Sequence, residues 1–130
     1  MKEVTCLNLH TRLTEDLPEI RSLVDQVFED DTYPRGGAIT AYALLSEAFI
    51  WGVFQPAAKH ADDGVLARCY DFVEALLCSP DRNLRDAALI RVVEYMSARP
   101  WRPFTAQLAG PLLSDLIRDD IIDPDHDREY

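Results

Sequence analysis

The chain is 130 residues long, which is enough to bury a hydrophobic core without disulfide bonds or metal ions. Hydrophobic residues make up 48% and charged residues 28%, proportions typical of a folded globular domain and not of a disordered chain. The formal net charge of −10 disfavours nucleic-acid binding, because that requires cationic side chains to neutralise phosphates.

The first 14 residues are compatible with either a short strand or an extended arm, so their structure is left open. A helix is predicted from Asp16 to Asp30. Asp16 can cap its start, Glu19 follows three residues later as in a capping box, and Pro18 is tolerated in a first turn. The apolar residues of this segment recur at helical spacing along one side: Leu17, Ile20, Leu23, Val24, Val27 and Phe28.

The segment 38–53 is predicted to form the central helix of the fold. It is apolar on nearly all sides, which is typical of a helix that several neighbours bury. Trp51 lies in this segment and is therefore expected in the core. Gly52, Pro56 and Gly64 then indicate a loop before the next helix.

Two further helices are predicted over residues 63–78 and 82–98, with the turn Ser-Pro-Asp between them. In the second of these helices, apolar residues at spacings of three and four predict one buried face: Leu89, Val92, Val93 and Met96. The connector 99–103 contains two prolines, which cannot lie in a helix interior, and is expected to be stiff.

A last helix is predicted over residues 104–122. Gly110 and Pro111 mark either a kink in it or a fresh start with proline in the first turn. Residues 123–130 read as an acidic tail. Because strand signals are almost absent, we expect one all-α domain over residues 1–130, with about five helices in antiparallel hairpins.

No motif indicates catalysis, a metal ion or a cofactor. The run Asp-Pro-Asp-His-Asp at residues 123–127 resembles the start of a calcium loop, but Arg128 stands where that loop requires glycine. The three histidines have no nucleophile motif beside them. We therefore expect no catalytic, metal-binding or cofactor-binding residues, and a small enzyme is the least favoured class.

The cysteine count and the N-terminus indicate a reducing compartment. Three cysteines without a CxxC pair are typical of reduced thiols, and Cys69 and Cys78 are expected as small core residues. The N-terminus lacks the apolar core of a secretory signal, and no apolar run reaches the roughly 18 residues that span a bilayer. A cytoplasmic protein without membrane contact is expected.

The stretch LLCSPDRNLRDAALIRVVEYM, residues 76–96, resembles a HEAT-type repeat, whose two helices meet at a conserved kind of turn. The matching residues are Leu76, Leu77, Asp81, Leu84, Arg85, Ala87 and Ala88. Asp81 can accept hydrogen bonds from free N–H groups at the helix start. Ser79 stands where that family usually has an acid, which puts the Asp–Arg pairing of the turn in doubt. The resemblance implies a HEAT-like helical bundle.

The chain as a whole resembles the small acidic α-helical immunity proteins of bacterial toxin systems, of the contact-dependent inhibition or polymorphic toxin kind. The shared features are the length, the helical hairpin, the acidity and the helix that follows Gly110-Pro111. The resemblance implies a cognate protein toxin domain as partner, basic and often a nuclease, with complementary charge speeding its capture.

The candidate partner-binding residues come from charge clusters and from one tryptophan. The acids are on the first predicted helix and the last one: Glu19, Asp25, Glu29, Asp115, Asp119 and Asp120. Trp101, between two prolines and near Arg99 and Arg102, is either an exposed interface anchor or a loop residue that packs on the helix ends. An alternative function is a helical adaptor or a subunit of a larger complex, for which the Trp101 segment is the expected contact.

Overall fold

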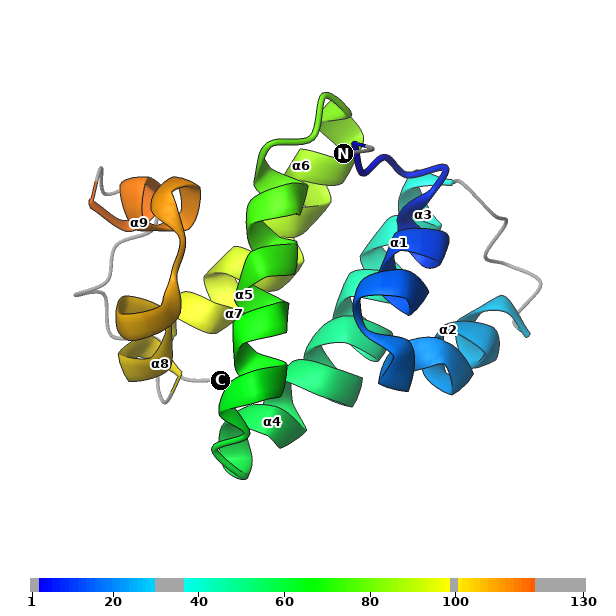
Figure 1. Ribbon diagram of the computed structural model, residues 1–130. Coiled ribbons are helices and arrows are strands. Elements are labelled where there is room, and N and C mark those ends of the chain that lie inside the picture. The colour runs from blue at the N-terminus through cyan, green and yellow to red at the C-terminus, as the bar shows by residue number, and fades with distance from the viewer. Residues whose placement is uncertain (1–2, 30–36, 99–100, 119–130) are drawn as a thin grey trace.

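A continuous helical segment from Ala38 to Lys59 crosses the centre of the computed structural model (Figure 1). The structure describes residues 3–29, 37–98 and 101–118, and in these ranges it contains seven helical segments and no strand. The all-α prediction is therefore confirmed, while the count of about five helices is low. Two additional segments account for the difference: one forms near the N-terminus, and the last predicted helix is divided in two.

The elements follow one another in short segments that often run on without a break. They are α1 (Leu9–Asp16), η1 (Pro18–Ile20), α2 (Arg21–Phe28), α3 (Ala38–Ala43), η2 (Leu44–Phe54), α4 (Gln55–Lys59), α5 (Asp63–Leu77), α6 (Arg82–Ala88), η3 (Leu89–Val93), α7 (Glu94–Ser97), α8 (Arg102–Leu108) and α9 (Pro111–Arg118). The predicted loop after residue 53 is wrong up to residue 59, because the helix continues through Pro56 into α4.

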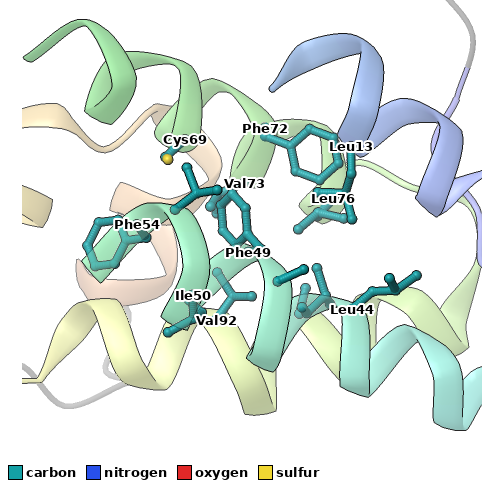
Figure 2. Packing of buried hydrophobic residues seen from close by; sticks show 14 of the residues in the cluster. Leu13, Leu44, Phe49, Ile50, Phe54, Cys69, Phe72, Val73, Leu76 and Val92 are labelled. Atoms are coloured by element: carbon teal, nitrogen blue, oxygen red, sulfur yellow. The ribbon is translucent and has the colours of Figure 1, made fainter. Parts of the chain in front are cut away.

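Neighbours cover the central helix on several sides, as its apolar composition predicts. The segments α2, α5 and η3 all pack against η2. Figure 2 shows Phe49 and Ile50 of the central helix among side chains of α5 and η3, including Val73, Leu76 and Val92. Each fully buried side chain of this size contributes about 1.5–3 kcal/mol.

By length and composition alone, the segment Ala38–Lys59 is long and apolar enough to cross a membrane. This differs from the expectation that no apolar run is long enough to span a bilayer. Core helices of globular folds pass the same test, and 56% of the apolar stretch is buried inside this fold.

The middle of the central helix, η2, is wound as a π-helix, with N–H groups bonded to carbonyls five residues back. The N–H of Gln55, for example, donates to the carbonyl of Ile50. A π-helix turns less per residue than an α-helix, so side-chain directions along it depart from the α-helical period. A second, shorter π-helical stretch, η3, packs against it.

The N-terminal residues form an arm followed by a helix. Leu9, Leu13 and Leu17 are fully buried at spacings of four, and they fix α1 against the core. Asp16 is the last residue of α1 and pairs with Arg12 at 3.3 Å. The prediction that Asp16 caps the next helix is therefore wrong, and that helix begins instead with the 3₁₀ turn at Pro18.

The turn between α5 and α6 binds the N-terminal arm through two side chains. Asp81 accepts hydrogen bonds from the N–H of Leu84 at 3.3 Å and, across the fold, from the N–H of Cys6 at 2.8 Å. The buried hydroxyl of Ser79 donates to the carbonyl of Val4. Residues 75 positions apart are thereby joined at one point.

The predicted cap is confirmed at Asp81, which also accepts from the N–H of Asn83 at 3.0 Å. The side chain of Arg85 donates to the carbonyl of Ser79 at 2.7 Å. A backbone oxygen thus occupies the place that an acid would take in the Asp–Arg turn pairing.

Gly110 and Pro111 mark a fresh start and not a kink. The carboxylate of Glu74, on α5, accepts from the N–H groups of Leu112 at 2.9 Å and Leu113 at 3.0 Å, and so caps α9 from another helix. A Cβ at Gly110 would lie 2.4 Å from the Glu74 side chain, so only glycine leaves room for this contact. The predicted helical residues 119–122 and the acidic tail lie outside the described residues.

We predict that Asp81→Asn lowers the free energy of unfolding by about 1 kcal/mol at pH 7, since a neutral amide replaces a carboxylate that accepts three N–H groups. The hydrogen bond from the Cys6 backbone is the main cause that lowers the pKa of Asp81. The stabilisation from the ionised Asp81 carboxylate is complete above about pH 5 and is lost as the pH falls through the lowered pKa.

Urea unfolding at pH 7, 5 and 3 checks this, with Asp62→Asn as the control. Asp62 caps α5 through one bond, from the N–H of Val65 at 3.2 Å, and does not hold the arm. The acid-dependent loss of stability should be smaller in Asp81→Asn than in the wild type. An equal loss in both proteins would contradict the role given to Asp81.

Candidate interaction surfaces

The predicted acidic contact residues do not form one surface. Figure 1 shows α2, which carries Asp25, on the opposite side of the molecule from α9, which carries Asp115. Asp25 and Glu29 are exposed, the latter just beyond the end of α2. Asp119 and Asp120 lie outside the described residues.

Glu19 already has a partner within the chain. Both of its carboxylate oxygens accept from Arg68 on α5, at 2.9 and 3.0 Å. These hydrogen bonds are the main cause that raises the pKa of Arg68. The two side chains are about two-fifths exposed, so the pair contributes at most about 1 kcal/mol. A partner that used Glu19 would have to compete with Arg68.

Of the two alternatives for Trp101, the structure shows the second, and it corrects the place expected for Trp51. Trp101 is 7% exposed and packs edge-on against Phe54, with ring centres 6.0 Å apart, so it caps the helix ends and is not an exposed anchor. Trp51 is 54% exposed, so its predicted place in the core is wrong. On an α-helix Trp51 would share a face with the buried Leu44 and Ala48, but the π-helical winding of η2 turns it away from them.

The inner side of Trp51 packs against a cluster of buried aromatic rings. Its ring lies 5.5 Å from Tyr95 of α7, and Tyr95 lies 6.1 Å from Trp101. Phe54 contacts both Tyr95 and Tyr70, at 6.2 and 5.8 Å. The exposed tryptophan is therefore fixed on a packed support and has little freedom to lose on binding.

Trp51 belongs to a surface that runs along the line where α3–η2 meets η3–α7. Two contacts cross this line, Trp51 with Tyr95 and Tyr42 with Arg91, whose guanidinium lies 5.4 Å from the ring centre. A depression of about 250 Å³ opens beside Tyr42, Arg91 and the 70% exposed Ile39. We call Ile39, Tyr42, Glu47, Trp51 and Arg91 the seam face. Tryptophan, tyrosine and arginine are the residue types that dominate binding energy in protein interfaces.

A larger groove, of about 620 Å³, lies between α1 and α5. Residues at the start of α1 and along it form one wall, and one face of α5 forms the other: Asn8, Thr11, Arg12, Glu15, Asp16, Arg68, Asp71, Phe72 and Ala75. Its volume is in the range of ligand-binding clefts. Three of the nine side chains are carboxylates, so the groove has an acidic rim.

A third hollow, of about 270 Å³, separates α9 from the α5–α6 hairpin. Four leucines line it with three charged residues, and the set is Leu77, Arg85, Asp86, Leu89, Leu112, Asp115 and Leu116. Asp115 is therefore placed at the edge of an apolar hollow, far from the acids of α2.

The cysteines divide into buried and accessible thiols. Cys69 is fully buried, as predicted, and burial raises its pKa to about 12. Partial burial and the neighbouring Asp81 raise the pKa of Cys6 to about 11. Cys78 is exposed, which overturns its predicted place in the core, because α5 ends one residue before it. Within the described ranges, no group of three His, Cys, Asp or Glu side chains is arranged to hold a metal ion.

Sequence patterns had pointed to neither the seam face nor the groove. The groove depends on α1, whose buried leucines at spacings of four were the available signal. The seam face depends on the π-helical winding, for which the sequence carries no recognised signal. Comparison of the chain with protein-family models, with curated proteins and with solved structures found no match.

We predict that Trp101→Ala destabilises the fold by about 3–5 kcal/mol, because it leaves a cavity among Phe54 and Tyr95. Trp51→Ala should cost about 1 kcal/mol or less, because that ring is already half in water. Urea unfolding of the two variants measures both values. Equal losses would contradict the placement of the two side chains.

Proposed function

We propose that this chain is a protein-binding module that captures and neutralises a basic toxin domain, as the small acidic α-helical immunity proteins it resembles do. The observation that carries the proposal is the uneven distribution of charge over the fold. Residues 9–29 hold five acids against two arginines. Residues 82–98 and 101–108 hold four arginines against two acids.

These two groups of charges lie in different parts of the molecule. Figure 1 shows α1 and α2 on one side and α8, which carries Arg102, on the other. The other three arginines lie on α6 and η3, between these two sides. The fold therefore presents an acidic end to an approaching partner. A basic domain would be attracted to that end and oriented by it, which speeds association.

The helical framework fits the same function. The hairpin of α5 and α6 resembles a HEAT-type pair, and its turn is fixed by Asp81 and by the N-terminal arm. A rigid frame of this kind holds surface acids in place, so this chain loses little conformational entropy when a partner binds. Asp25 and Glu29 are the exposed acids of α2 that the frame presents.

The proposal is tested with the C-terminal domain of the large secreted protein expected from the adjacent upstream reading frame. Expression of that domain alone should arrest growth, and co-expression of this chain should restore it. The purified complex should weaken at least about 10-fold between 50 and 500 mM salt. Failure of this chain to restore growth, or a salt-independent affinity, would contradict the proposal.

In the same assay, Asp25→Lys with Glu29→Lys should slow association about 10-fold. The matched control is Glu3→Lys with Asp63→Lys, which changes net charge equally at exposed positions outside α2. The control should change the association rate by less than about 3-fold, through long-range attraction alone. If both pairs slow association equally, only net charge matters and the acids of α2 have no special role.

The seam face supports a second function, that of an adaptor or subunit in a larger complex. Its exposed Trp51 and Ile39 are apolar, and Arg91 lies beside them. This surface replaces the Trp101 segment as the contact for that function, because Trp101 is buried.

We predict that cross-linking in cells gives a larger complex that Trp51→Ser with Ile39→Ser abolishes. The control is Leu112→Ser, a 39% exposed apolar residue on α9, which should leave the complex intact. The complex should persist in cells that lack the upstream secreted protein. If it disappears with that protein, the cross-linked partner is the toxin and the adaptor function is wrong.

A further inference from the structure

The groove between α1 and α5 has the shape of a site for an elongated ligand. On α5 its lining residues are Arg68, Asp71, Phe72 and Ala75, which at spacings of three and four form one helical face. Asn8 to Asp16 line the opposite wall over eight residue steps, about 12 Å of helix. A groove bounded by two helices accepts a side-chain row of a third segment, the arrangement seen when an amphipathic helix docks.

The floor and the rim of the groove differ in chemistry. Phe72 is almost fully buried beneath the groove, and Ala75 is half-buried on it, so the floor is apolar. Glu15 and Asp71 stand on opposite walls, Glu15 on α1 and Asp71 on α5. Neither forms an ion pair with any base among the described residues. Among the residues that the structure describes, the groove therefore offers two carboxylates without a counterion, above an apolar floor.

The two arginines of the groove are already engaged. The guanidinium of Arg12 is nearly buried and donates to Asp16 at 3.3 Å. The guanidinium of Arg68 binds Glu19 through both of its terminal nitrogens. An anionic ligand would have to displace these carboxylates, whereas a cationic ligand would find Glu15 and Asp71 open.

We propose that this groove receives a segment of the partner protein that carries arginine or lysine side chains. The aliphatic stem of such a side chain packs on Ala75 and Phe72, while its charged head reaches Glu15 or Asp71. The inference rests on the proposed function, in that the partner is a basic protein domain. It adds the place where the partner is anchored, as distinct from the acids of α2 that attract it.

The test uses the full chain and a defined probe in place of the toxin. The probe is an acetylated 12-residue alanine-based peptide with arginine at every third or fourth position, labelled with fluorescein. Two comparison peptides carry glutamine or glutamate in place of arginine. Anisotropy gives the affinity, and backbone amide shifts of the ¹⁵N-labelled chain give the location.

The arginine peptide should bind and shift amides of α1 and α5, whereas the glutamine and glutamate peptides should bind at least about 10-fold more weakly. Glu15→Lys with Asp71→Lys should weaken the arginine peptide at least about 10-fold, since each reversal replaces an attraction by a repulsion. Glu3→Lys with Asp63→Lys makes the same change in net charge at exposed positions outside the groove. It should weaken the peptide by less than about 3-fold.

Several results would overturn the proposal. They are the absence of binding at millimolar arginine peptide, amide shifts that map outside α1 and α5, equal weakening by the two reversal pairs, and tighter binding of the glutamate peptide. If the lysine pair reduces the helical signal in circular dichroism, Glu15→Gln with Asp71→Asn replaces it, with an expected loss of about 3-fold.

The two proposals fail separately. If the chain neutralises the toxin domain but the peptide fails in the ways just described, the groove assignment is wrong and the proposed function stands. If the peptide binds in the groove as described but the chain does not restore growth, the proposed function is wrong and the groove remains a site for basic segments.

Discussion

The fold depends on the need to keep the helix Ala38–Lys59 out of water. Its side chains are apolar on nearly every side, so a single partner helix cannot cover it. Leu23 of α2 packs so closely on it that a Cβ at Gly52 would lie 2.3 Å from the Leu23 side chain. The α5 helix covers a second side with Phe72 and Val73, and η3 covers a third with Val92.

The remaining elements are attached to this covered helix by polar contacts at a few points. Asp81 and Ser79 fasten the N-terminal arm to the α5–α6 turn. Glu74 fastens α9 to α5, and the buried hydroxyl of Thr105 fastens α8 through Tyr70 at 2.7 Å. In each case the hydrogen bonds satisfy polar groups that would otherwise be buried without a partner or left unpaired at a helix end.

The surfaces follow from what this packing leaves uncovered. The seam between η2 and η3–α7 reaches solvent, and the π-helical winding brings Trp51 to it. The α1 helix packs through its leucines but leaves a groove beside α5, whose rim holds Glu15 and Asp71. The acidic end and the groove lie in the same part of the fold, so the basic partner that we propose would be attracted and held in one place. The seam face supplies an apolar surface of different chemistry.

Local patterns in the sequence determined the class of the fold and its strongest helices. Asp81, followed by apolar residues at spacings of three and four, correctly predicted the start of α6. This worked because a capping residue lies directly beside the helix that it caps. The same local reasoning placed α5 and the buried Val92, Val93 and Met96. It left α1 open, because short helices of this length are stable only through their packing.

The tertiary structure alone decided which residues reach the surface and which meet. Trp51 is exposed because the π-helical winding of η2 departs from the α-helical period. Trp101 is buried because it packs into the cluster of aromatic rings around Phe54. Glu19 meets Arg68 across 49 residues, and Glu15 and Asp71 come to share a groove. Composition and helical period are properties that the chain carries without folding, and they were enough to predict that the protein is acidic and all-α. Contacts between distant segments depend on how the helices pack around Ala38–Lys59, so only the folded chain shows where a partner can bind.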